Sequence, residues 1–170
     1  MKVTLINDQS KIKLDLDLIR EVAAYISDKF DKDLKSELNI VFSDGKEIRK
    51  LNKKYRRIDR ETDVLSFSYI SDKDKMISLG TSVANTAIAA STASTSNTNT
   101  VGEIIICPEV AQSNVLKQDE NWNLNLEIIL LITHGILHIY NYDHEEEENR
   151  IDMENIQNSL VSDVRRTFKL

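Results

Sequence analysis

The segment from Leu124 to Tyr140 constrains the fold of this chain most strongly. It reads LNLEIILLITHGILHIY, so that aliphatic side chains would lie on nearly every side of a helix. A helix with so little polar surface has to be buried against other elements of the fold. A chain of 170 residues is long enough to supply the surrounding core within one domain. The sequence therefore predicts a globular domain built around one central helix.

Short strands and further helices account for most of the remaining chain. Strands are predicted where apolar and polar residues alternate, or where apolar residues run together, at residues 2–6, 36–42, 63–70 and 102–107. Helices are predicted from apolar residues at helical spacing over residues 15–30, 44–55, 108–117, 124–140 and 145–168. About four strands and about five helices in irregular order predict an α+β fold, a single domain with a mixed sheet.

Local signals also fix several turns. Ser43 or Asp44 can cap the helix that follows it, and Pro108 suits the first turn of another helix. Asn141 stands where the chain must turn after the central helix, and asparagine tolerates a left-handed backbone.

The residues from about 71 to 100 differ in composition from the rest of the chain. Most of this stretch is Ser, Thr, Ala and Asn, and the run TSVANTAIAASTASTSNTNT carries no charge. A segment with so few large apolar side chains adds little to a core. We therefore expect a single domain over residues 1–170 with a low-complexity insertion at about 71–100.

The charge distribution is polarised. The net charge of −6 argues against a protein that coats nucleic acid non-specifically, but binding depends on where the charges lie. The stretch from residue 46 to residue 60 is strongly basic, and only Glu47 and Asp59 oppose its cations. These cations are Lys46, Arg49, Lys50, Lys53, Lys54, Arg56, Arg57 and Arg60.

All three histidines of the chain fall in the string HGILHIYNYDH. His134 and His138 are four residues apart, so on a helix their imidazoles lie on one face. His144 follows a turn and can approach the same point from another direction. Three neutral imidazoles leave one tetrahedral position of zinc open, which is the catalytic arrangement. The sequence therefore predicts one zinc ion per chain, held by His134, His138 and His144.

The same spacing occurs in the metzincin proteases, but one residue differs. Their motif, HExxHxxGxxH, has a glutamate directly after the first histidine as general base. This chain has Gly135 there, which argues against peptide hydrolysis.

Three segments together resemble the YbeY family of metal-dependent endoribonucleases. HGILHIYNYDH is similar to the family signature HGxLHLxGYDH, and NKKYRRIDRETDVLSF to its N-x-x-Y-R-x-x-D-x-x-T-D-V-L-S-F segment. GEIIICPEVA is similar to its GDIxIC strand and following helix. The resemblance covers nearly the whole chain outside residues 71–100. Three positions depart from the family pattern, namely Asn141 for glycine, Ser68 for proline and Glu103 for aspartate.

The resemblance implies an activity and a set of site residues. The three histidines match the family's zinc ligands, and Arg56 matches an arginine associated with activity. The family's role implies a single-strand-specific endoribonuclease of rRNA maturation, including 16S rRNA 3′-end processing, and of ribosome quality control. The expected partners are ribosomal RNA and the ribosome or its subunits, with no membrane, while the oligomeric state stays open.

Ribonuclease chemistry agrees with the residues themselves. A three-histidine zinc makes an activated water available near neutral pH, and a guanidinium such as that of Arg56 stabilises charge on a phosphodiester. Asp143 could orient a ligand imidazole or cap the last helix. Cys107, the one cysteine, is expected to be a small buried apolar residue.

The alternatives are another metallohydrolase and a non-catalytic ribosome-associated zinc protein. A deaminase would be expected to pair its metal ligands with a nearby catalytic glutamate and a C-x-x-C segment, and the sequence has neither pattern. The absence of a signal peptide and of paired cysteines favours a cytoplasmic location.

Overall fold

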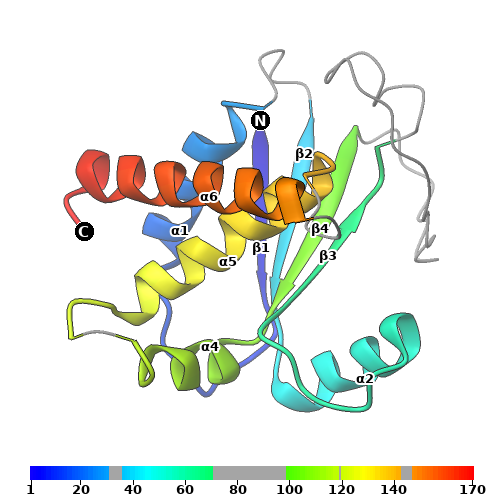
Figure 1. Cartoon of the computed structure of the whole chain (residues 1–170). Helices are drawn as coiled ribbons and strands as arrows, with labels where there is room; N and C mark the ends of the chain where they lie inside the picture. Colours follow the sequence, from blue (N-terminus) through cyan, green and yellow to red (C-terminus); the bar gives the residue numbers. More distant parts are fainter. Residues whose placement is uncertain (31–35, 71–98, 119, 143–146) are drawn as a thin grey trace.

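A computed structural model describes residues 1–30, 36–70, 99–118, 120–142 and 147–170 (Figure 1). The strands are β1 (Lys2–Asn7), β2 (Glu37–Phe42), β3 (Val64–Ser68) and β4 (Thr100–Ile106). The helices are α1 (Leu16–Ser27), α2 (Gly45–Arg56), α4 (Pro108–Val115), α5 (Leu124–Ile139) and α6 (Glu147–Phe168). Four strands and five helices over these ranges confirm the predicted α+β fold with a mixed sheet.

The sheet has the strand order β1-β2-β4-β3. β1, β2 and β4 run parallel, whereas β3 pairs antiparallel with β4. The parallel pair β1 and β2 is joined through α1, since parallel neighbours need a crossover connection. β3 is thus an edge strand beside the longest strand of the sheet.

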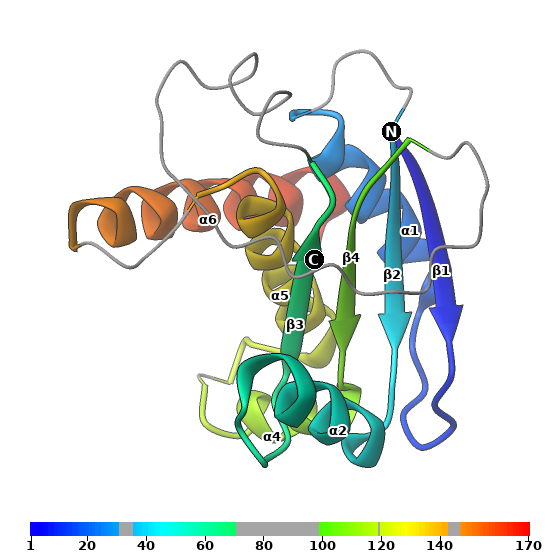
Figure 2. The same ribbon diagram turned by 90° about the vertical axis from the view of Figure 1, so that its right-hand side faces the viewer.

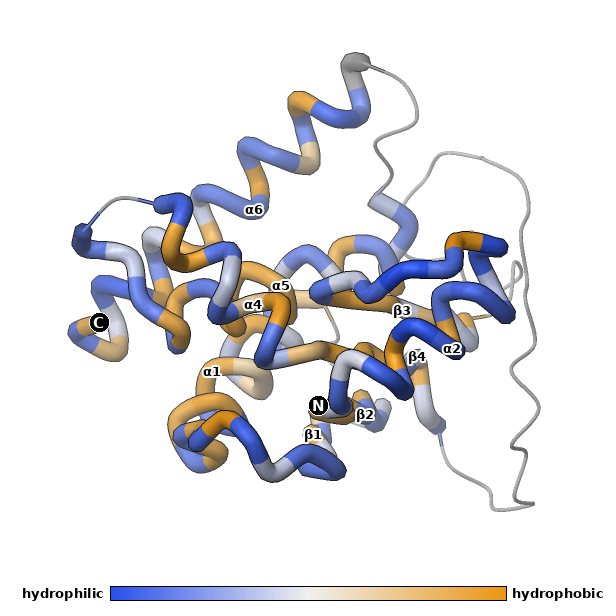
Figure 3. Tube along the Cα trace, turned by 90° about the horizontal axis from the view of Figure 1, so that it is seen from below, coloured by the Kyte–Doolittle hydropathy of each residue, from blue (hydrophilic) through white to orange (hydrophobic). Residues whose placement is uncertain are grey.

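One face of the sheet forms the main core with α1, α5 and α6 (Figures 1 and 2). β2 alternates strictly, with Leu38, Ile40 and Phe42 turned into this core. α5 is buried along nearly its whole length and appears largely orange in Figure 3. The predicted burial of the central helix is confirmed.

Among the described residues, α2 alone covers the opposite face of the sheet, and it does so at one end (Figure 2). Ile48 of α2 packs there with Leu65, Ile105 and Cys107 in a second, smaller apolar cluster. Cys107 has no exposed surface, which confirms that it is a small buried apolar residue. The rest of α2 is polar and is mostly blue in Figure 3.

Three predicted turn signals are confirmed. The Asp44 side chain accepts a hydrogen bond of 2.8 Å from the Glu47 amide, and Pro108 lies in the first turn of α4. Asn141 has a φ of 63° in the left-handed region. β4 begins at Thr100, two residues earlier than predicted, because Thr100 pairs with Glu37 across the sheet.

The structure does not describe residues 71–98, so nearly all of the predicted insertion lies outside the described residues. None of the helices in the described ranges is long and apolar enough to cross a membrane.

Candidate metal centre

His134 and His138 lie one turn apart on the same side of α5, where both side chains are half-buried. Their Nε2 atoms are 3.1 Å apart, and their ring centroids are separated by 4.6 Å. The two rings are nearly perpendicular, with an interplanar angle of 79°. This geometry brings two imidazole nitrogens to one point, as the spacing in the sequence predicts.

The distance between these nitrogens fits a shared zinc ion. Zinc binds histidine nitrogen at about 2.0–2.1 Å, so two ligands of a tetrahedral ion lie about 3.3 Å apart. The observed separation of 3.1 Å is close to this value. His134 and His138 therefore have the donor type and the spacing that zinc requires.

Gln157 of α6 fixes the other side of the first imidazole. Its Oε1 lies 3.0 Å from His134 Nδ1. An amide oxygen only accepts hydrogen bonds, so His134 carries its proton on Nδ1 and keeps the Nε2 lone pair for a metal. No signal in the sequence points to Gln157, because its position in a polar helix says nothing about which element that helix packs against.

The remaining predicted residues of the centre, His144 and Asp143, lie outside the described residues. Over the ranges that are described, no group of three or more His, Cys, Asp or Glu side chains could hold a metal ion. The chain does turn where the prediction requires. The Asn141 amide donates to the His138 carbonyl at 3.0 Å, and the Tyr142 amide donates to the Leu137 carbonyl at 2.9 Å.

Gly135, between the two histidines, is packed against the sheet. A Cβ atom at this position would lie 2.8 Å from Ile104 Cδ1 of β4. The space needed by a longer side chain is therefore already filled. This contact gives a structural reason why a glutamate base of the metzincin type is absent.

β3 is fastened to the end of α5 beside this centre. The Ser68 hydroxyl donates a hydrogen bond of 2.9 Å to the Ile139 carbonyl. Gly102 of β4 permits the close approach, since a Cβ there would lie 2.6 Å from the Phe67 carbonyl oxygen and 2.7 Å from Ile139 Cδ1. Ser68, where the family often has proline, thus links the edge strand to the helix that carries the histidines.

Arg56 is the last residue of α2, and its side chain is exposed. Arg57 follows in the left-handed conformation, with a φ of 62°, and turns the chain away from the helix. Buried Asn52 holds this turn, because its Nδ2 donates to the Arg60 carbonyl at 2.9 Å and its own carbonyl accepts from the Arg57 amide. No contact joins Arg56 to His134 or His138 in the part of the chain that the structure describes. α2 and α5 lie on opposite faces of the sheet (Figures 1 and 2).

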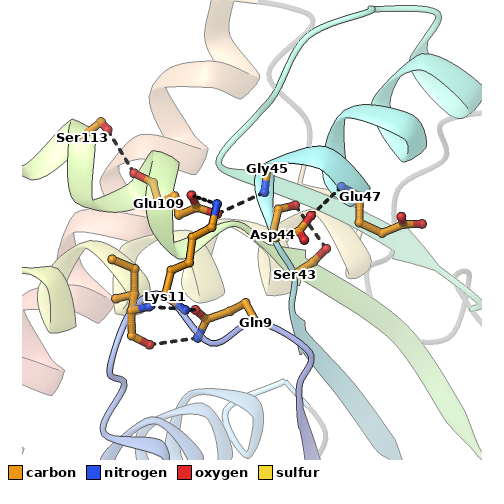
Figure 4. Close-up of polar contacts among 9 residues, drawn as sticks. Gln9, Lys11, Ser43, Asp44, Gly45, Glu47, Glu109 and Ser113 are labelled. Atoms are coloured by element: carbon orange, nitrogen blue, oxygen red, sulfur yellow. Dashed lines mark hydrogen bonds and ion pairs between the residues drawn. The ribbon is translucent and has the colours of Figure 1, made fainter.

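Open α/β sheets often bind ligands at the carboxyl ends of their parallel strands, but acidic side chains line that end of this sheet. Glu109 pairs with Lys11 at 2.7 Å and accepts from the Gly45 amide at 3.3 Å (Figure 4). A pocket of about 310 Å³ at this end is lined in part by four carboxylates, those of Asp8, Asp44, Glu47 and Glu103. This concentration of negative charge disfavours phosphate.

Comparisons with known proteins agree with the motifs. The profile of the endoribonuclease YbeY family matches residues 4–165. An endoribonuclease YbeY of Finegoldia magna is 30% identical over 167 residues, covering 96% of this chain and 94% of its own. One of Clostridioides difficile is 28% identical and spans 98% of this chain and 99% of its own.

A solved structure shares the fold. The solution structure of TM1509 from Thermotoga maritima superposes with a TM-score of 0.61 at 26% identity. The match covers 98% of this chain and 91% of that one. Because the family profile matches almost the full length, this chain belongs to the endoribonuclease YbeY family.

Proposed function

We propose that this protein is a zinc-dependent, single-strand-specific endoribonuclease of rRNA maturation, including 16S rRNA 3′-end processing, and of ribosome quality control. Family membership supports the nuclease activity. The observation that carries the metal dependence is the 3.1 Å separation of the His134 and His138 Nε2 atoms.

The three histidines would hold one zinc ion per chain, with His144 as the third ligand. The ion would supply Lewis-acid chemistry at a phosphoryl group and an activated water molecule. Gln157 keeps the His134 proton on Nδ1, so that Nε2 needs no deprotonation before it binds. Asp143 is a candidate for orienting another ligand imidazole.

Arg56 would stabilise the negative charge that develops on the phosphodiester, since a guanidinium donates two parallel hydrogen bonds to phosphate oxygens. Its exposed side chain carries no ion pair among the described residues, so it is available to a substrate. The expected partners are ribosomal RNA and the ribosome or its subunits, in the cytoplasm.

Two measurements on the native chain and on His138→Ala test the proposal. Bound metal is determined by elemental analysis, and cleavage is followed with single-stranded and structured rRNA fragments. One zinc per chain and RNA cleavage, both lost in His138→Ala, is the expected result.

Other outcomes lead elsewhere. Zinc retained by the native chain without any cleavage would favour a non-catalytic, ribosome-associated role. A native chain purified without chelator that holds no metal would overturn the proposed zinc dependence. Cleavage of a peptide substrate instead of RNA would favour another metallohydrolase.

A further inference from the structure

β3 turns its side chains alternately to two different surfaces. Ser68 points to the core face, where it bonds to α5. Leu65 packs with Ile48 of α2 on the opposite face, and Phe67 contacts Tyr55 there. Since residues two apart in a strand share a face, Tyr69 lies on the same side as Phe67. The edge strand therefore separates the histidine-bearing helix α5 from the residues Tyr55, Phe67 and Tyr69, which are called the aromatic surface below.

Tyr69 is the exposed member of this surface, with 42% of its area accessible. Its backbone is fixed, because its amide donates to the Val101 carbonyl at 2.8 Å and so extends the β3 ladder. Partial burial raises the pKa of Tyr69, and the charges of Glu103 and Tyr55 raise it further. Tyr69 thus directly follows β3, with its backbone held to β4.

Tyr55 of α2 and Phe67 of β3 form a ring pair on this face. Their ring centroids are 5.1 Å apart in an edge-to-face arrangement. The Lys54 ammonium lies 4.7 Å from the centroid of the Tyr55 ring. Aromatic residues and a cation therefore meet at the junction of α2 and β3.

The cations at the end of α2 differ in how far they are neutralised. Arg49 and Lys53 both pair with Asp59, at 2.8 Å and 2.7 Å. The described residues offer no ion-pair partner to Lys54 and Arg56 of α2, or to Arg57 and Arg60 directly after it. Positive charge is thus left without an ion pair at the end of α2, where Lys54 lies over the Tyr55 ring.

Negative charge on β4 and positive charge at the end of α2 lie on the same side of the sheet. Glu103 pairs with Phe67 in the sheet and places a carboxylate at the aromatic surface. That carboxylate repels phosphate, whereas the cations at the end of α2 attract it. A polynucleotide strand is therefore favoured with its phosphates along α2 and its bases over β3.

We propose that Tyr69, on the same face as the Tyr55–Phe67 pair, stacks against an unpaired base of RNA whose phosphates are bound by Lys54, Arg57 and Arg60. This inference rests on the proposed function and adds a binding subsite to it. Stacking on an aromatic side chain needs a base that is free of its helix. The surface therefore favours single strands over duplexes, and RNA bound there crosses the β3 edge to reach the histidines.

The test measures binding of the full chain to a short single-stranded oligoadenylate, with a chelator present to prevent cleavage. Loss of one stacked base weakens binding about 5- to 150-fold, which is the effect expected for Tyr69→Ala. Tyr69→Trp keeps an aromatic ring and should bind oligoadenylate as tightly as the native chain does. Ile6→Ala is the matched control, because Ile6 is 40% exposed and lies on the opposite edge strand. This control should bind as the native chain does.

A second probe separates stacking from charge. An oligomer of the same length without bases should bind the native chain and Tyr69→Ala equally. Oligoadenylate should quench the fluorescence of the indole in Tyr69→Trp. The native chain, whose one tryptophan is Trp122, provides the reference signal. Equal affinities of native chain and Tyr69→Ala for oligoadenylate would overturn the subsite while leaving endoribonuclease activity intact. A native chain that neither binds nor cleaves single-stranded RNA would overturn the subsite and the proposed function together.

Discussion

Gly135 of α5 faces Ile104 of β4 so closely that a Cβ atom on the glycine would lie 2.8 Å from Ile104 Cδ1. This contact sets how near the histidine-bearing helix lies to the sheet. It also ties the separation of α5 and β4 to the geometry of the candidate metal centre, because Gly135 directly follows His134.

Gly135→Ala is expected to lower the free energy of unfolding by about 1 kcal/mol. Overpacking costs about 1–3 kcal/mol, and alanine returns about 1 kcal/mol through its higher helix propensity. Ile104→Val removes the Cδ1 atom that the new methyl group meets, so the double variant should lose less than the sum of the two single changes. Urea unfolding of all four proteins measures this coupling, and strict additivity would contradict the close contact.

Gln157→Leu should weaken zinc binding about 10- to 100-fold, as is typical when a residue that orients a histidine ligand is lost. Gln157→Glu keeps an acceptor at the same position and should retain tight binding. Competition with a chromophoric chelator gives both affinities. The tautomer of His134 can be followed independently by nitrogen NMR of the metal-free protein, where the Nδ1 proton should persist only in the native chain and Gln157→Glu. Unchanged zinc affinity in Gln157→Leu would remove Gln157 from the centre.

Arg56→Glu should abolish RNA cleavage while leaving zinc content and thermal stability unchanged. The side chain is exposed at the end of α2, so reversing its charge disturbs no buried contact. Lys46→Glu, at the other end of the same helix, is the matched control and should retain most of the activity. Undiminished cleavage by Arg56→Glu would exclude this arginine from the mechanism.

Because of Asp163, the free energy of unfolding should fall as the pH is lowered through the acidic range. Hydrogen bonds from Tyr25 and Lys29 lower the pKa of its carboxyl from 3.8 to about 2. A lowered folded-state pKa means that the stabilisation is complete above about pH 5 and is lost as pH falls through about 2. Native chain and Asp163→Asn should therefore differ most in urea unfolding at neutral pH, and the gap should narrow between pH 4 and pH 2. Asp17→Asn, which removes a pair on a 93% exposed carboxylate, should show little difference at any pH.

Much of the fold followed from local patterns in the sequence. Alternation in residues 37–42 and the apolar run before Cys107 identified the strands that form the centre of the sheet. Asp44 and Asn141 act at the positions where the sequence predicted a cap and a turn, because both effects involve only neighbouring backbone. The boundaries were less exact. β4 begins at Thr100 through pairing with a distant strand, which no local pattern reports.

The candidate metal centre was predicted in the same way. His134 and His138 share a face because helical geometry alone places residues four apart together. The sequence shows that Arg56 belongs to a basic segment, but it does not show where that segment lies in the fold. In the structure, Arg56 lies at the exposed end of α2, across the sheet from α5. The metal-ligand roles of His134, His138 and His144 stay predictions, and so do the roles of Arg56 and Asp143.

The sequence by itself determined the buried helix, the placement of two histidines on one face of it and the family, because these depend on residues close together in the chain. Only the tertiary structure decided that Gln157, which is 23 residues from His134, supplies the hydrogen-bond acceptor. It also decided that β3 faces α5 on one side and the Tyr55–Phe67 pair on the other. Such relationships arise from the packing of separate elements, and packing depends on the shape of whole surfaces rather than on any local pattern.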